Sequence, residues 1–97
     1  MTPDLDIEHT LDGDQGRYWA ELGEGAQAEM TYLRRPDNAI IITHTGVPPA
    51  FEGRGIALKL VKRAVADARE HNFKIVPQCP YVAVQFRRHP DWDELLA

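Results

Sequence analysis

The sequence is poor in cysteine and in long apolar runs. Its single cysteine, Cys79, excludes an internal disulfide, and no cysteine–histidine spacing matches a zinc site. No stretch approaches the ~18 uncharged apolar residues that a membrane-spanning helix needs. The acidic start, MTPDLDIEHT, lacks the apolar core of a secretory signal. These absences predict a cytoplasmic protein that binds no metal and does not enter a membrane.

Basic residues are scarce in the first third of the chain. Residues 1–30 carry eight acidic side chains and one arginine, a net charge of −7, within a chain whose total is −4. An acidic protein is not expected to be a general nucleic-acid binder, because such proteins show a basic excess. The remaining residues hold ten basic and seven acidic side chains. That part of the chain therefore suits a small anionic ligand.

The size and composition are those of one globular domain. The chain has 97 residues, of which 43% are hydrophobic and 27% charged. This balance excludes disorder as the dominant state, and two domains would each be too small to bury a core. We therefore expect residues 1–97 to fold as a single domain.

Three segments near the N-terminus alternate apolar and polar residues, as half-buried strands do. They are residues 5–11, 17–22 and 26–32, and clusters of glycine, aspartate, asparagine and proline separate them. Strands joined by short turns predict an antiparallel meander. Residues 39–45 form a nearly continuous β-branched run, which predicts a strand buried on both faces and central in a sheet.

The second half of the chain predicts helices alternating with one strand. Apolar residues recur at helical spacing from Ala57 to Ala68, opposite Lys59, Lys62 and Arg63. A short strand over 73–76 and helices over 81–88 and 91–96 follow. The order is β-β-β-β-α-β-α, with a parallel crossover between residues 39 and 76. The fold class is therefore α+β, or mixed α/β, with helices packed on a sheet.

A glycine-rich loop, Glu52-Gly53-Arg54-Gly55-Ile56-Ala57, lies between the buried strand and the long helix. The first amides of a helix have no partner within the helix, and the helix dipole favours an anion there. The loop therefore predicts a phosphate or pyrophosphate site, to which Arg54 adds a positive charge. It lacks the lysine of a Walker A loop and the third glycine of a dinucleotide fingerprint. Glycines that only turn the chain are the alternative interpretation.

Three stretches together resemble the GNAT superfamily of N-acetyltransferases, and within it a short branch that lacks the usual N-terminal helices. They are residues 44–49, 52–57 and 77–82, and the resemblance is strongest over residues 39–96. It implies a GNAT-like fold, in which an antiparallel meander is followed by β-α-β-α around a central mixed sheet. It also implies an N-acyltransferase that moves an acetyl group from acetyl-CoA to an amine.

The resemblance implies a set of residues that bind acetyl-CoA. In the family, a Q/R-x-x-G-x-G/A motif holds the pyrophosphate through backbone amides. Here Gly55 and Ala57 match this motif, whereas Glu52 replaces the usual Gln or Arg. The family also implies that the strand ending at His44-Thr45 separates from its neighbour and that a bulge exposes its backbone to the pantetheine. The implied contacts with the cofactor are Thr45, Val47, Gly53, Arg54, Gly55, Ile56, Ala57 and Tyr81.

The catalytic residues are less clear from the pattern. Arg87 stands where many family members have the tyrosine that protonates the departing thiolate. Cys79 precedes a predicted helix, and a helix start favours the reactive thiolate form of a cysteine. Cys79 is therefore a candidate to carry the acetyl group covalently, and direct transfer past an inert Cys79 is the alternative. His44 is either a general base or a structural histidine of the strand, and Tyr81 either a proton donor or a core residue.

Two functions agree with these observations. The first is the acetyltransferase, whose acceptor amine belongs to a protein or to a small molecule. The second is a CoA-binding or protein-interaction module with little or no catalytic activity. The sequence leaves the oligomeric state, monomer or homodimer, open.

Overall fold

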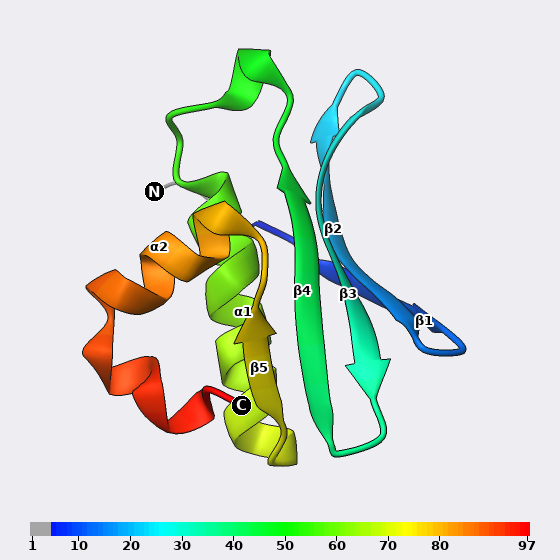
Figure 1. Ribbon diagram of the computed structural model, residues 1–97. Coiled ribbons are helices and arrows are strands. Elements are labelled where there is room, and N and C mark those ends of the chain that lie inside the picture. Colours follow the sequence, from blue (N-terminus) through cyan, green and yellow to red (C-terminus); the bar gives the residue numbers. More distant parts are fainter. Residues whose placement is uncertain (1–4) are drawn as a thin grey trace.

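Five strands form one mixed sheet whose spatial order follows the sequence (Figure 1). The computed structural model describes residues 5–97, so the first four residues of the acidic N-terminal stretch lie outside the described residues. The strands β1 to β4 pair antiparallel, and β5 pairs parallel with β4. This confirms the meander and the parallel crossover. The strands are β1 (Glu8–Asp12), β2 (Gln15–Gly23), β3 (Ala26–Arg35), β4 (Ala39–Gly46) and β5 (Lys74–Pro77).

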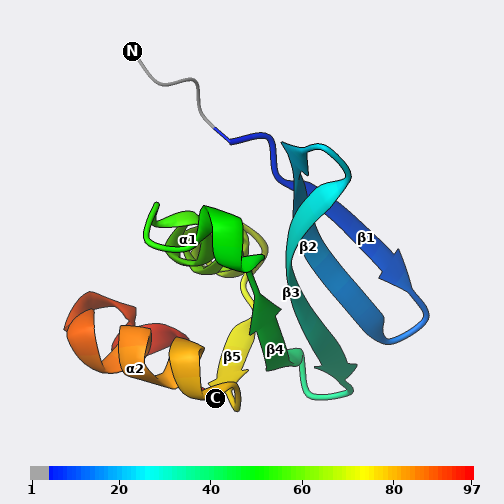
Figure 2. The same ribbon diagram turned by 90° about the horizontal axis from the view of Figure 1, so that it is seen from above.

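Two α-helices and two short 3₁₀ helices accompany the sheet. They are η1 (Pro49–Phe51), α1 (Ile56–His71), α2 (Pro80–Arg88) and η2 (Pro90–Leu95). Figure 2 shows α1 against one face of the sheet, while α2 lies beside β5. Within residues 5–97, no helix covers the opposite face of β2 and β3. None of the helices in that range is long and apolar enough to cross a membrane.

The core lies between α1 and the sheet. The apolar face of α1 is buried, as its spacing predicts, and Asn72 ends the helix in the left-handed conformation. Two details differ from the prediction. Ala57 is only half-buried, because it belongs to the first turn beside the glycine loop. Arg63 is also half-buried, because its guanidinium lies over the Tyr18 ring and donates to the Ile7 carbonyl at 3.0 Å.

The burial predicted for β4 is correct for only one of its faces. Ile40 and Ile42 are buried against the core, but Ile41 between them is only half-buried. The strand has neighbours on both sides, yet it lies next to the edge strand β5 rather than at the centre of the sheet. Only one face of β4 is buried because α1 covers a single face of the sheet (Figure 2).

Several predicted boundaries shift by a few residues. The predicted first strand begins only at Glu8, and all five residues of β1 are exposed, while Leu5 and Ile7 pack on the core just before it. The strand β5 includes Pro77 as its last residue, which is possible because an edge strand tolerates the missing amide of proline. The last predicted helix is the 3₁₀ helix η2, in which Leu96 N donates to Asp93 O at 3.1 Å.

Candidate functional site

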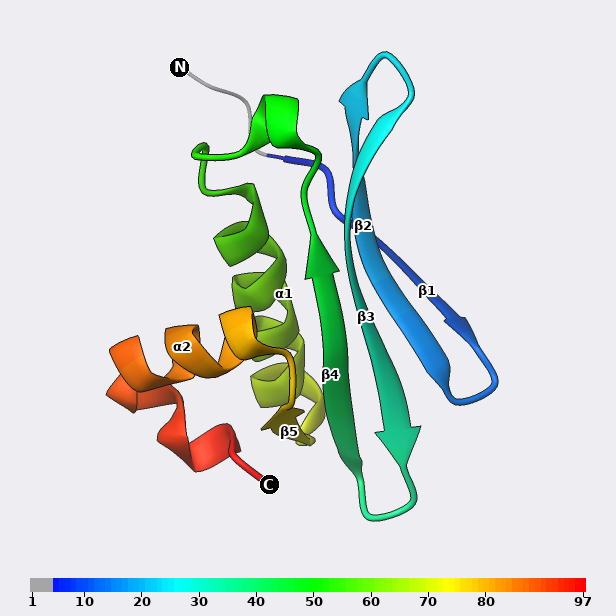
Figure 3. The ribbon, with the colours of Figure 1, turned by 45° about the horizontal axis from the view of Figure 1, so that its top comes forward.

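The glycine loop runs from η1 to the first turn of α1 (Figure 3). Gly53 and Gly55 adopt φ angles of +79° and +75°, a region that side chains other than glycine rarely enter. Gly55 is the N-cap of α1, so it provides no side-chain cap to the first amides of the helix. A Cβ atom on either glycine would meet nothing within 4 Å. The loop therefore presents backbone amides beside open space.

A cavity of about 420 Å³ lies in front of this loop. Its wall is formed by the end of β4, the segment from η1 to α1, and the first turn of α2. Seven of the eight predicted cofactor contacts line it: Thr45, Val47, Gly53, Gly55, Ile56, Ala57 and Tyr81. Arg54 does not line it, because its guanidinium stacks on the Phe51 ring, 5.2 Å from the ring centroid. Phe51 and Glu52 complete the wall, and Phe51 is not among the site residues predicted from the sequence.

The strands β4 and β5 separate beside this cavity. Their parallel pairing ends where Ile42 faces Pro77, whereas β4 continues to Gly46. The pairing of β3 with β4 also skips Thr43, since Thr31 faces His44 and Tyr32 faces Ile42. This extra residue is a β-bulge. The separation and the bulge expected from the family resemblance are therefore both present.

Cys79 lies behind the cavity wall. It is 6% exposed and is the N-cap of α2. Its amide donates to Ile42 O at 2.8 Å, and its carbonyl accepts from Ala83 N at 2.9 Å. Its thiol donates to the Thr45 hydroxyl, with Sγ 3.6 Å from Oγ1. Thr45 lines the cavity, whereas Cys79 does not.

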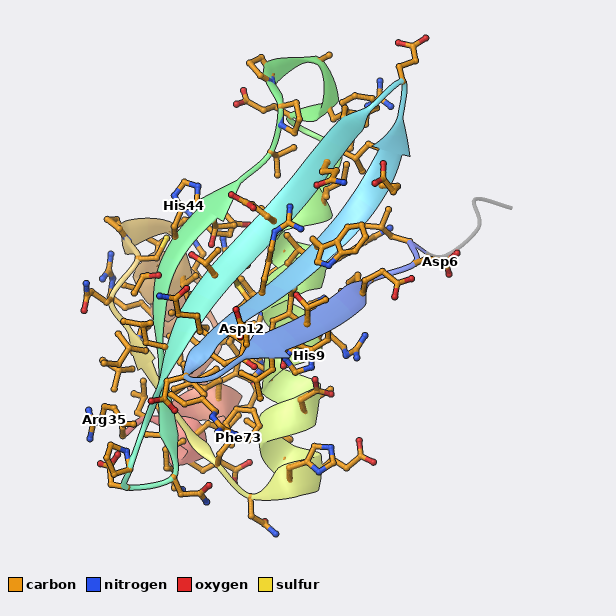
Figure 4. All side chains as sticks on the ribbon, turned by 90° about the vertical axis from the view of Figure 1, so that its right-hand side faces the viewer. Asp6, His9, Asp12, Arg35, His44 and Phe73 are labelled. Atoms are coloured by element: carbon orange, nitrogen blue, oxygen red, sulfur yellow. The ribbon has the colours of Figure 1, made fainter. Side chains whose placement is uncertain are left out.

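His44 lies on the other side of β4 from Thr45. Figure 4 shows it on the sheet face that carries no helix, and its side chain is 61% exposed. His44 Nε2 lies 3.9 Å from Glu29 Oε2, while Glu29 Oε1 accepts a hydrogen bond from Arg17 Nε at 2.8 Å. Glu29 and Arg17 are not predicted as site residues from the sequence, because only the pairing of β2, β3 and β4 brings them beside His44.

Two further residues bear on proton transfer. Tyr81 lines the cavity, and burial raises the pKa of its phenol above the ordinary value of 10.0, while the nearby Arg88 charge opposes the rise. Its phenol therefore stays protonated at neutral pH. Arg87 is exposed near the end of α2 and does not line the cavity.

A larger cavity, of about 820 Å³, lies between the C-terminal half of α1 and the sheet. Its wall contains His9, Tyr18 and Asp67, and Figure 4 shows His9 and Phe73 on this side of the molecule. The Tyr18 hydroxyl donates to Asp67 Oδ2 at 2.8 Å, and burial together with this carboxylate strongly raises the Tyr18 pKa. None of the predicted site residues lines this cavity.

Comparisons with known proteins agree with this geometry. Residues 17–95 match the family model described as GCN5-related N-acetyl-transferase. The NMR solution structure of a GCN5-like protein from Staphylococcus aureus matches with a TM-score of 0.67 and 28% sequence identity, over 93% of this chain and 87% of that one. No curated protein matched the chain. Because the family model spans most of the sequence and the fold agrees, the chain belongs to the GCN5-related N-acetyltransferase family.

Proposed function

We propose that this protein transfers an acetyl group from acetyl-CoA to an amine. The observation that carries the proposal is the cavity at the start of α1. Seven of the residues expected to bind the cofactor line it, and the first backbone amides of the helix lie beside it. Membership of the family supports the same activity. The acceptor is an amine of a protein or of a small molecule.

In this proposal the glycine loop holds the pyrophosphate of the co-substrate. The left-handed Gly53 and Gly55 let the backbone of residues 53–57 approach the phosphate oxygens, and the dipole of α1 favours their negative charge. Lys59 is exposed on the next turn of the helix and adds a positive charge. Beyond Ile42 the backbone of β4 lacks a parallel partner, so its groups near Val47 pair with the amides of the pantetheine.

The acceptor amine approaches from the helix-free face of the sheet. His44 and Glu29 lie on that face, while Thr45 and Tyr81 lie on the side of the cavity. The amine nitrogen attacks the acyl carbon in the gap between β4 and β5, and His44 accepts a proton from it. Backbone amides near Val47 polarise the thioester carbonyl. We favour direct transfer, because the Cys79 sulfur does not line the cavity.

The test is to mix the protein with acetyl-CoA and a panel of amines. Released CoA thiol is measured together with the mass of the acetylated amine, and we expect the two to appear in equal amounts. A control reaction without amine gives the rate of acetyl transfer to water. A protein that binds CoA but releases no thiol with any amine or with water would support the second function, a CoA-binding module. The absence of a tyrosine at Arg87 is the observation that favours that module.

A further inference from the structure

We propose that Thr45 and Cys79 form a proton relay that protonates the departing CoA thiolate. The inference rests on the proposed function and identifies the side chains that protonate the leaving group of that reaction. When the acyl carbon–sulfur bond breaks, the bonding electron pair stays on sulfur. A nearby proton donor lowers the barrier to this cleavage.

The cavity offers few groups that could donate this proton. In the described part of its wall, the hydroxyl groups belong to Thr45 and Tyr81. Burial raises the pKa of the Tyr81 phenol, which makes it a weaker acid than an ordinary tyrosine. Arg87 lies outside the cavity, and a guanidinium does not give up a proton in proteins. An aliphatic hydroxyl by itself is a weaker acid still, but Thr45 contacts the Cys79 thiol, which can replace the proton that the hydroxyl gives up.

The contact between Thr45 and Cys79 gives the threonine a proton source. A hydroxyl has one proton to donate and two lone pairs that accept. The Cys79 thiol occupies one lone pair of Thr45 Oγ1, at 3.6 Å, so the hydroxyl proton can point into the cavity. Two backbone hydrogen bonds, from Cys79 N to Ile42 O and from Ala83 N to Cys79 O, fix the cysteine in place.

This arrangement suits a proton source better than a nucleophile. Cys79 is buried and does not line the cavity, whereas Thr45, which its thiol contacts, does. A covalent attack by Cys79 on the thioester would require its sulfur to reach a cavity that it does not line. A proton reaches the cavity through the Thr45 oxygen without any such movement. The relay runs from the Cys79 thiol to the CoA thiolate, so the proton passes between two sulfur atoms of similar chemistry.

The step balances as follows. The departing sulfur takes the Thr45 hydroxyl proton, and the Thr45 oxygen takes the Cys79 thiol proton. The products are a CoA thiol, a neutral Thr45 and a Cys79 thiolate. His44 takes the proton that the amine nitrogen loses on forming the amide and releases it to solvent, and a solvent proton that enters through the cavity and Thr45 restores the Cys79 thiol.

Matched substitutions test the relay. Thr45→Val keeps the shape of the side chain but removes the hydroxyl, and Thr45→Ser keeps the hydroxyl. We expect Thr45→Val to lower kcat on the order of a hundredfold, as loss of a general acid does, and Thr45→Ser to retain most of the rate. Cys79→Ala should lower kcat comparably, and Cys79→Ser should recover part of the loss. The double variant should be no slower than Thr45→Val, because the two residues act in one chain.

Further readouts do not depend on turnover. Circular dichroism and thermal unfolding should show that each variant keeps the fold, and isothermal titration separates any loss of CoA affinity from the loss of kcat. Intact-mass measurement after mixing with acetyl-CoA alone should show no acetyl adduct on Cys79. An adduct that then discharges to an amine would overturn the relay in favour of covalent transfer.

A large loss of rate in Tyr81→Phe, with none in Thr45→Val, would assign the proton to Tyr81 and overturn the relay as well.

Failure of the relay can be told apart from failure of the proposed function. Release of CoA thiol to water uses the same bond cleavage as release to an amine, so it measures the relay without a known acceptor. A wild-type protein that binds acetyl-CoA and releases CoA to neither water nor any amine contradicts both proposals. An active wild-type enzyme whose rate Thr45→Val leaves unchanged contradicts the relay alone.

Discussion

Gly16 in β2 leaves room for the ring of a residue on the neighbouring strand. An ideal Cβ on Gly16 would lie 2.0 Å from Tyr32 Cζ, and Tyr32 is buried with its hydroxyl bonded to His9 Nε2 at 2.5 Å. The ring therefore has little freedom to move. We expect Gly16→Ala to lower the free energy of unfolding by about 1–3 kcal/mol, the usual cost of overpacking. Urea denaturation measures this change.

Gly46→Ala is the matched control, because it introduces the same methyl group into a strand. Its Cβ would meet His44 Nε2 at 3.0 Å, and that imidazole is exposed and able to move. We expect a loss within about 0.5 kcal/mol, as for most surface substitutions. Equal losses at Gly16 and Gly46 would show that the Tyr32 ring yields as easily as the His44 ring.

At the scale of elements, His9 ties the exposed strand β1 to the core. Its ring stacks on Tyr18 with centroids 4.3 Å apart, and Asp67 and Arg63 of α1 lie near it. Burial of the ring is the main cause that lowers the pKa of His9 below 6.5, and the Asp67 charge opposes this effect. The folded protein therefore favours neutral His9 more than the unfolded chain does.

The sign of the pH dependence follows from this preference. Above pH 6.5 both states hold neutral His9, so its contribution to stability is complete. As the pH falls through 6.5 toward the lower pKa of the folded state, the unfolded chain binds the proton first and the protein loses stability. Urea denaturation above and below pH 6.5 should show this loss of stability. His9→Gln should remove the part of the loss that comes from protonation of His9. An identical pH dependence in His9→Gln would contradict the assignment.

The packing of α1 on the sheet gives a second prediction for an element. Val61 is fully buried, so Val61→Asp places an unpaired charge in the core and should cost about 3 kcal/mol or more. Ala66 is exposed on the same helix, and Ala66→Asp should cost less than about 1 kcal/mol. Thermal melts of the two variants measure the difference. A melt of Val61→Asp that barely moves would show that this face is not core.

For the whole molecule, local patterns predicted most of the fold. The meander, the long helix α1 and the parallel crossover follow from periods of two and of 3.6 residues, which the chain carries locally. The exposed β1 and the half-buried Ile41 were not predicted, because they depend on which sheet face a helix covers. The inward turn of Arg63 depends in the same way on a distant ring, that of Tyr18.

The site could be predicted only where sequence neighbours form it. The glycine loop is continuous in the sequence, so its position at the start of α1 was evident from the residues. The contact of Cys79 with Thr45 joins residues 34 positions apart and depends on where β4 and β5 separate. The stacking of Arg54 on Phe51 was missed because a side-chain direction within a loop has no periodic signal.

The central claim is that CoA binds with its pyrophosphate on the backbone of residues 53–57. Isothermal titration with CoA, of the wild-type protein and two variants, tests it most directly. Gly55→Val places a side chain where the backbone must approach phosphate, at a φ of +75°. Gly13→Val is the control, because Gly13 has a similar φ of +62° but lies in the turn between β1 and β2, outside the cavity. We expect Gly55→Val to weaken CoA binding by about tenfold or more and Gly13→Val to leave it unchanged. A folded Gly55→Val variant that binds CoA with wild-type affinity would contradict the account.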